Sequence, residues 1–446
     1  MKENLNQDDI IKILLSNDQK QIQDIIDDIH PADILDIIHK DQKNIYLYLE
    51  HLPREIIADI IEEAKAEEQY DLLQLFVDSD QVEILEEMDN DEITDLIGEL
   101  DQEEIEDIFE KISLEDQVEI KKLLTFDPES AGGIMSTEYI DIHANNTVQE
   151  TLEFLQTNSE EDTTYYLYVV DKQNVLKGVV SLRDIVTSPF DTPMLEITNT
   201  NVKKLHYSVD QEEVSKKFIK YGFILMPVVD DEDHLLGVIH FDDVMEVIEE
   251  ETTEDMNLLG GVHSEERVNS SLLESFRSRT PWLCVNLLTA SMAASIVNHF
   301  EGTIEQVVAL ATITPIVAGL GGNAGTQSLT IMVRALSLGE VDKKNARSIL
   351  IKEIGVGFLN GITIGTLAGI GAGLFAGNFY FGVVTGLAMF FSMILATIAG
   401  YFVPTILKRC NVDPALASGV FVTMCTDMLG FFFFLALATF FVDKLI

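Results

Sequence analysis

The chain of 446 residues carries 76 Asp and Glu side chains but only 29 Lys and Arg, which gives a formal net charge of -47. A surface this acidic repels nucleic acid and attracts cations, so nucleic acid is excluded as a partner. The charge is unevenly distributed, because residues 271–446 hold 10 basic and 9 acidic side chains and residues 1–270 hold nearly all of the acidic excess. This difference predicts a domain boundary near Ser270.

The sequence gives no sign of secretion. Its three cysteines lie in or beside apolar segments, which predicts no disulfide framework and suits a reducing cytoplasm. The opening residues, MKENLNQDDI, lack the charged-then-apolar pattern of a signal peptide. We therefore expect the acidic residues 1–270 to stay on the cytoplasmic side of a membrane.

Residues 1–130 are predicted to form an acidic, all-α superhelical domain. Apolar residues recur at i, i+3 and i+4, and a short theme returns unevenly as ADILDII, EIIADII, DEITDLI and EEIEDIF. Helices of this kind stack into an α-solenoid or pack as a compact bundle. Asp91 and Asp95 are spaced i, i+4, so their carboxylates share one helix face, where a divalent cation would relieve their repulsion. A solvated acidic face is the competing interpretation.

Residues 131–255 switch to an α/β pattern that occurs twice. A run of Val-Val-Asp ends at Asp171 and again at Asp230, 59 residues later. Each run is followed by a turn, a second strand that contains a glycine, and the start of a helix. The equal offset predicts two copies of one α/β unit.

The repeat resembles a pair of cystathionine-β-synthase (CBS) domains, at about 131–197 and 198–255. The first copy keeps Ser181, Arg183 and Asp184, the pattern by which many CBS modules hold a nucleotide ribose. The second copy has a histidine where the first has its serine. A nucleotide site and a dimerisation module without nucleotide both remain open at this point.

Residues 246–270 connect the acidic part to the apolar part. They begin as a helix rich in carboxylates and continue to a Gly-Gly pair at 260–261. A connector helix in this position can transmit regulatory movement into the apolar part. A plain acidic linker helix is the simpler interpretation.

Residues 271–446 are predicted to form a transmembrane domain with five helices. The apolar segments are Pro281–Phe300, Ile304–Ser337, Ala346–Ala376, Phe381–Leu407 and Ala415–Val442. Lys and Arg lie before the first segment, between the second and third, and between the fourth and fifth, whereas the other two connections have none. This alternation predicts a cytoplasmic N-terminus and an extracellular C-terminus. Together the parts predict a multidomain α+β membrane protein.

Two of these segments carry polar residues at mid-membrane depth. In the second, Pro315 and several glycines are expected to weaken the helix, while Asn323, Thr326 and Gln327 supply amide and hydroxyl oxygens. The fifth holds Asp427 near its middle. An Asp at a helix centre costs about 2.5–3.5 kcal/mol and is retained for function or as a satisfied hydrogen-bonding group. Oxygen-only donor sets suit hard cations such as Mg²⁺ and Ca²⁺.

Four stretches of the chain resemble the MgtE family of magnesium channels in their order and spacing. They are HPAD from His30, ESAGGIMSTE from Glu129, GGNAGTQS from Gly321, and DPAL from Asp413 followed by Thr426-Asp427. The resemblance covers essentially the whole chain. It implies a homodimer in the lipid bilayer of the plasma membrane, with one pore on the two-fold axis.

The resemblance also implies which residues bind Mg²⁺. The second and fifth spans would line the pore, where Asp427, Gly322, Asn323 and Thr326 would meet hydrated Mg²⁺. Cytosolic Mg²⁺ would close the pore when its concentration is high, and ATP would modulate the CBS pair. The regulatory ligands carried over residue by residue are Asp59, Asp91, Asp95, Asp210, Glu212, Asp243, Glu246, Glu251, Glu254 and Asp255. Two positions depart from some relatives, which have Asp in place of Gly222 and Asn in place of Thr326.

These observations favour a self-regulated Mg²⁺ channel. The alternative is an ion-coupled secondary transporter of divalent cations, because a mid-membrane polar site would serve it too. A membrane-tethered nucleotide sensor would leave Asp427 unexplained. An enzyme is not expected, since the sequence has no recognisable nucleophile–base set, phosphate loop or zinc spacing.

Overall fold

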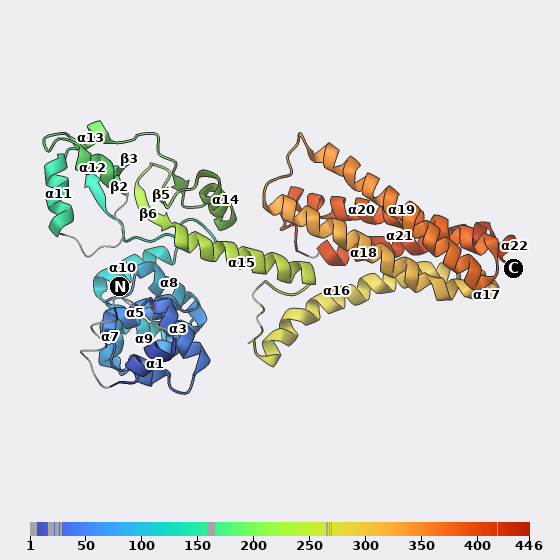
Figure 1. Cartoon of the computed structure of the whole chain (residues 1–446), viewed down its shortest axis with the longest axis horizontal. Coiled ribbons are helices and arrows are strands. Elements are labelled where there is room, and N and C mark those ends of the chain that lie inside the picture. Colours follow the sequence, from blue (N-terminus) through green and yellow to red (C-terminus); the bar gives the residue numbers. More distant parts are fainter. Residues whose placement is uncertain are drawn as a thin grey trace. The chain divides into compact units, whose positions relative to one another are not determined.

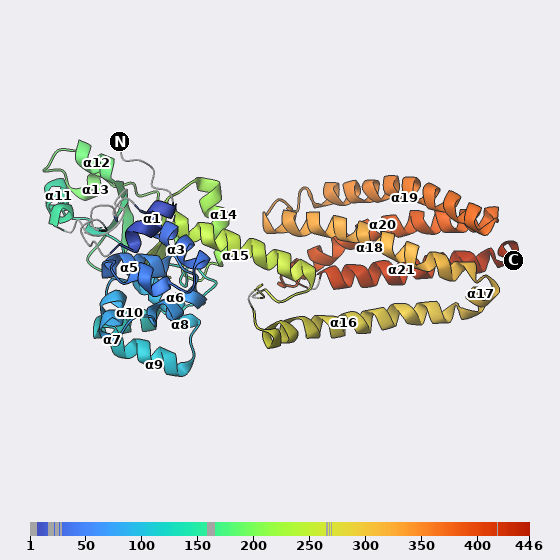
Figure 2. The ribbon, with the colours of Figure 1, turned by 60° about the horizontal axis from the view of Figure 1, so that its bottom comes forward.

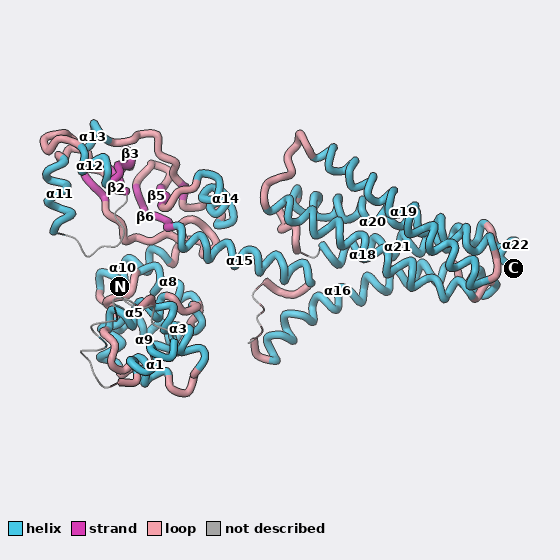
Figure 3. The backbone as a smooth tube through the Cα atoms, viewed as in Figure 1, coloured by secondary structure: helices cyan, strands magenta, loops and turns pink. Residues whose placement is uncertain are grey.

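The computed structural model describes residues 7–16, 22, 26, 29–157, 166–264, 266, 268, 270–416 and 418–446. The chain divides into two compact units, Met1–Ile248 and Glu249–Ile446 (Figure 1). Among the described residues, strands occur only in the first unit (Figure 3). The predicted combination of an all-α part, an α/β part and an apolar helical part is confirmed.

The first unit begins with short amphipathic helices that share one apolar core. They are α1 (Gln7–Leu14), α3 (Pro31–Lys40), α4 (Ile45–Leu49), α5 (Arg54–Glu62), α6 (Ala66–Leu73), α7 (Asp78–Leu85), α8 (Asn90–Gly98), α9 (Gln102–Lys111) and α10 (Leu114–Leu123). The isoleucines of the repeated theme supply much of this core, and Ile34, Ile57 and Ile60 are fully buried. Local signals set several helix starts, since α9 begins at a capping box formed by Asp101 and Glu104.

Two three-stranded sheets follow, and they have the same topology. The first contains β1 (Asp141–His143), β2 (Tyr166–Val170) and β3 (Leu176–Ser181); the second contains β4 (Leu205–His206), β5 (Leu225–Val229) and β6 (Leu235–His240). In each sheet the first strand is parallel to the second, which is antiparallel to the third. The register shifts at the same step in both, Val169/Val170 and Val228/Val229, which confirms the predicted repeat.

Helices flank these sheets and lead into the second unit. They are α11 (Val148–Thr157), α12 (Leu182–Thr187), α13 (Met194–Ile197) and α14 (Gln211–Tyr221). After β6, the connector forms α15 (Phe241–Gly260), which is acidic in its first turn. The predicted connector helix is therefore present and starts directly at the end of the second sheet.

The second unit is a bundle of long helices. It contains α16 (Leu272–His299), α17 (Glu301–Gln306), α18 (Ala309–Ser337), α19 (Ala346–Ala376), α20 (Phe379–Arg409), α21 (Ser418–Phe440) and α22 (Val442–Leu445). Four of the described helices, α16, α19, α20 and α21, are both long enough and apolar enough to cross a membrane. With 29 residues α18 is also long enough, but its hydropathy is lower than that of these four. α16 and α19 lie on opposite sides of the bundle, next to α21 and α20 respectively (Figure 2).

The predicted weakening of the second apolar segment is wrong. α18 is one uninterrupted helix through Pro315 and its glycines, and it begins at Ala309 because the preceding residues form the separate helix α17. The glycines allow neighbouring helices to approach closely. An added Cβ at Gly325 would lie 2.7 Å from Val422 Cγ1, and one at Gly400 would lie 2.7 Å from the Gly325 carbonyl oxygen. Tertiary packing thus holds a helix whose own propensity is low.

Candidate functional site

One face of α18 is polar and exposed. Asn323, Thr326, Gln327 and Thr330 are exposed, and their i, i+3, i+4, i+7 spacing places them on the same side of the helix. We call these four residues the polar face. Sequence reasoning missed Thr330, although the helical period that continues from Asn323 would have found it. Hydroxyl and amide oxygens on one helix face can replace part of the hydration shell of a hard cation.

The opposite side of α18 packs against α21, the helix that carries Asp427. Besides its contact with Val422, an added Cβ at Gly325 would lie 3.1 Å from Thr426 Cγ2. Thr426 is buried, and the next residue, Asp427, is half-buried. The structure therefore brings the glycine-asparagine stretch of the second span against the Thr-Asp stretch of the fifth. Four predicted residues, Gly322, Asn323, Thr326 and Asp427, lie on these two packed helices.

A second concentration of carboxylates lies in the first unit. We call Glu62, Asp89, Asp91, Glu92 and Glu138 the acidic cluster. The pKa of Asp91 is raised to about 7, mainly because the carboxyl is buried, and repulsion from Asp89 and Asp243 contributes to the rise. Burial, together with nearby carboxylates, also raises the pKa of Glu62 to about 7, of Glu138 to about 8 and of Glu92 to about 9.

The contacts of the acidic cluster explain why its charges remain close together. Glu62 Oε1 accepts a hydrogen bond from the backbone N–H of Asp89 at 2.8 Å. The Ser136 hydroxyl donates to Asp91 Oδ1 at 3.1 Å. These two hydrogen-bond donors are uncharged, so they hold the carboxylates in place without neutralising their charge. The repulsion between the carboxylates is relieved when some of them are protonated, and a bound cation would relieve it in the same way. The atoms that the acidic cluster offers as metal ligands are carboxylate oxygens, which suit a hard divalent cation.

The predicted regulatory residues divide into three groups. The first group lies at the acidic cluster. Asp91 is one of its members, and the neighbouring carboxylates of Asp59, Asp95 and Asp243 each raise the pKa of a member. Sequence reasoning missed the other four members of the acidic cluster.

Asp210 and Glu212 have local structural contacts instead. The Asp210 side chain caps α14, and Glu212 forms an ion pair with Lys216 at 2.7 Å. Gly222, one of the two departures from relatives, caps the other end of α14 with φ of +65°, a left-handed conformation that favours glycine.

The remaining predicted regulatory residues lie on α15. Glu246, Glu251, Glu254 and Asp255 all belong to this one helix. In the second unit, Asp255 Oδ2 accepts a hydrogen bond from the Ser337 hydroxyl at the end of α18, at 3.1 Å. One turn further along α15, Leu258 is buried with Leu329 of α18 and Val422 of α21. The end of the connector helix therefore packs directly on the two helices that carry the polar face and Asp427.

The predicted nucleotide residues surround the start of α12. Ser181 caps this helix, since its hydroxyl accepts from the Asp184 backbone N–H at 3.1 Å and donates to Asp184 Oδ2 at 2.6 Å. Arg183 and Asp184 are exposed. The three residues are thus adjacent, and two of them are accessible to a ligand.

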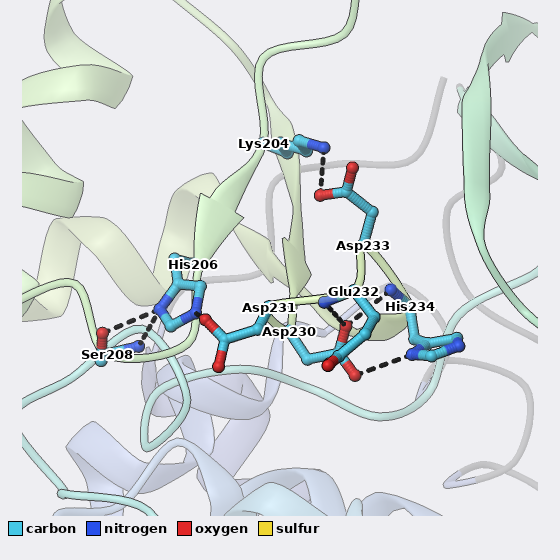
Figure 4. Close-up of polar contacts among 8 residues, drawn as sticks. All are labelled: Lys204, His206, Ser208, Asp230, Asp231, Glu232, Asp233 and His234. Carbon is cyan, nitrogen blue, oxygen red and sulfur yellow. Dashed lines mark hydrogen bonds and ion pairs between the residues drawn. The ribbon is translucent and has the colours of Figure 1, made fainter.

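A group of metal-ligand type occurs in the turn after β5, but its contacts mark it as structural. Ligand atoms of Asp230, Glu232 and His234 lie within 4.8 Å of one another (Figure 4). Asp230 Oδ1 accepts from two backbone N–H groups of the turn, and Oδ2 contacts His234 Nδ1 at 2.8 Å. In the first repeat Asp171 makes the same turn contacts without a histidine. The arrangement therefore belongs to the turn of the repeat.

Comparisons with known proteins agree with this architecture. Residues 314–437 match a family described as divalent cation transporter, residues 29–129 match the MgtE intracellular N domain, and residues 131–190 and 195–250 match the CBS domain. The magnesium transporter MgtE of Thermus thermophilus is 33% identical over 432 residues, which cover 95% of this chain and 96% of the relative. That of Bacillus subtilis is 30% identical over 451 residues and the full length of both chains.

A solved structure also resembles part of the chain. The cytosolic domain of the Mg²⁺ channel MgtE in complex with ATP is 31% identical, with a TM-score of 0.51, and covers 54% of this chain and 100% of its own. The fold and the polar face define a multi-pass membrane transport protein with a large acidic extramembrane part. The chain belongs to the MgtE family, and this identification confirms the resemblance seen in its motifs.

Proposed function

We propose that this protein is a channel for Mg²⁺ that mediates magnesium uptake and is closed by cytosolic Mg²⁺. The observation that carries the proposal is the exposed polar face of α18, a helix whose opposite side packs against the Asp427-bearing helix in a largely apolar bundle. Mg²⁺ loses its waters reluctantly, so a carboxylate with amide and hydroxyl oxygens suits a partly hydrated ion. Gly322, Asn323, Thr326 and Asp427 are the proposed pore residues. No enzymatic activity is part of this function.

The proposed assembly is a homodimer in the plasma membrane. Polar side chains are costly against lipid tails and face a protein interior or an aqueous path. A two-fold axis beside α18 and α21 would place two copies of the polar face and of Asp427 around one wet pathway. The alternation of Lys and Arg between the spans supports a cytoplasmic first unit and an extracellular C-terminus.

The proposed gate is the connector helix. Contacts of Leu258 and Asp255 with the ends of α18 and α21 suit a closed pore. At low Mg²⁺ the repulsion within the acidic cluster and along α15 would loosen the cytosolic part, and at high Mg²⁺ bound ions would favour the closed packing. A ligand shifts such a balance only by its differential affinity for the two states. The ten predicted carboxylates are the proposed ligands for this effect.

ATP is the proposed modulator of the CBS pair. Ser181, Arg183 and Asp184 adjoin one another at the start of α12, and a relative of the cytosolic part has been solved in complex with ATP. The exposed Arg183 would suit a phosphate group, and the Asp184 carboxylate would suit a ribose hydroxyl.

Flux through purified protein tests the proposed pore. The full chain and its Asp427→Ala variant are reconstituted in liposomes that contain a Mg²⁺ indicator. The exposed Asp443, which follows α21, provides the matched control Asp443→Asn. We expect Mg²⁺ entry for the wild type and the control, and entry at the level of empty liposomes for Asp427→Ala. Wild-type flux in Asp427→Ala would eliminate the pore assignment, and flux that requires a Na⁺ or H⁺ gradient would favour the coupled transporter.

A further inference from the structure

Glu353 of α19 is a buried carboxylate that the proposed pore does not use. Its exposed fraction is 4%, although the bundle around it is apolar. Lys352 Nζ lies 4.0 Å from Glu353 Oε1, but the lysine side chain itself is 66% exposed. An ionisable group in such a position is costly and normally has a specific partner. Its close partner is on the neighbouring helix α18.

That partner is Ser328. The Ser328 hydroxyl, also buried, donates to Glu353 Oε2 at 2.7 Å and lies 3.2 Å from the backbone carbonyl oxygen of Thr397 in α20. One serine of α18 is therefore in contact with both α19 and α20. The crossing is tight, because an added Cβ at Gly400 of α20 would lie 2.7 Å from Ser328 Cβ. No apolar side chain could replace the directional contact between Glu353 and Ser328.

Ser328 lies on the side of α18 away from the polar face. At 3.6 residues per turn, it is about 150° around the helix from the centre of the polar face. Glu353 therefore does not face the proposed pathway and is not a candidate ligand there. A contact behind a helix instead fixes the rotation of that helix, and with it the directions of Asn323 and Thr326.

We propose that Glu353 is a positioning residue that acts through Ser328 to hold α18 in the rotation at which its polar face meets Mg²⁺. This inference rests on the proposed pore. Removing Ser328 leaves the buried Glu353 carboxylate without this hydrogen bond, and removing Glu353 leaves Ser328 only its longer contact with the Thr397 carbonyl oxygen. Either change loosens the contact between α18 and α19 and allows α18 to rotate. The affinity of the pathway for Mg²⁺ should change, as well as the amount of folded protein.

A double-mutant cycle in the reconstituted full chain tests the inference. Mg²⁺ flux is measured over a range of Mg²⁺ concentrations for Glu353→Ala, Ser328→Ala, the double variant and Glu353→Gln. The exposed Glu340, in the connection between α18 and α19, provides the control Glu340→Gln. The concentration for half-maximal flux is the readout, because loss of folded protein alone lowers the maximal flux and leaves this concentration unchanged.

We expect each alanine variant to raise the half-maximal concentration about three- to tenfold, and the double variant to show no more than the larger single effect. Glu353→Gln should lie within about twofold of the wild type, because its amide oxygen can still accept from Ser328. Additive effects, or wild-type half-maximal concentrations in Ser328→Ala and Glu353→Ala, would overturn the positioning role. Absence of flux in the wild type and in Glu340→Gln would instead overturn the proposed channel.

Discussion

Gly400→Ala is the most informative single change in the bundle, because its effect can be estimated from distances. An added Cβ would lie 2.7 Å from the Gly325 carbonyl oxygen and 2.9 Å from the Leu329 backbone nitrogen. Ordinary contacts begin near 3.4 Å, so α18 and α20 must separate by about 0.7 Å. Overpacking of this kind costs about 1–3 kcal/mol. Alanine has a higher helix propensity than glycine, which stabilises the helix by about 1 kcal/mol, so the net loss in the free energy of unfolding is about 0–2 kcal/mol.

Thermal unfolding of the detergent-purified chain measures this loss, and Mg²⁺ flux measures its effect on the polar face. A loss of 1 kcal/mol lowers the Tm of a unit of this size by about 2–4 °C. Gly355→Ala in α19 is the matched control, because nothing lies within 4 Å of its added Cβ. We expect Gly400→Ala to unfold at a lower temperature and carry less Mg²⁺, and Gly355→Ala to equal or exceed wild-type stability. Equal Tm values for the two variants would refute the close-packing argument.

Two further outcomes follow from the raised pKa values and from the connector contact. The pKa values of Asp91 and Glu92 are raised to about 7 and about 9, so the cation-free first unit loses stability as these carboxyls ionise between about pH 5 and 9. Mg²⁺ should therefore raise the Tm of the first unit more at pH 8 than at pH 6. An equal Mg²⁺ effect at both values would contradict a cation site in the acidic cluster. Leu258→Ala removes a side chain buried against Leu329 and Val422, and such losses cost about 2–5 kcal/mol. Channel currents at millimolar cytosolic Mg²⁺ should then persist in that variant, whereas unchanged closure would exclude Leu258 from the gate.

Much of the fold could be predicted from the sequence because local patterns determine it. The segment predicted at residues 346–376 is α19 with the same bounds, since Gly377 follows it with φ of +63° and ends the helix. The offset between Asp171 and Asp230 predicted two equal units, and the two sheets share even the position of their irregular step. Apolar periodicity and turn residues act over a few neighbouring positions, so they can be recognised in the sequence alone.

The continuity of α18 could not be predicted in this way. Its proline and glycines lower its helix propensity, yet contacts with α20 and α21 keep it helical. The contact between Ser328 and Glu353 is likewise invisible in the sequence, because 25 residues separate two side chains that only tertiary packing brings together.

The candidate sites were only partly readable for the same reason. Asp427 was identifiable because one carboxylate in an apolar segment is unusual. The acidic cluster was not, since Glu62, Glu92 and Glu138 are three among 76 acidic residues and become distinct only when the fold buries them together. Asp427 and the acidic cluster carry the two proposed roles, ion conduction and Mg²⁺ sensing, and one measurement tests both together.

Single-channel recording of the purified full chain in a planar bilayer is that measurement. Mg²⁺ is the permeant ion, and its concentration is varied on the side that faces the acidic part. We predict discrete openings whose probability falls as this Mg²⁺ rises to millimolar levels, and none in the Asp427→Ala variant. Openings in Asp427→Ala, or an open probability that does not change with cytosolic Mg²⁺, would contradict the account.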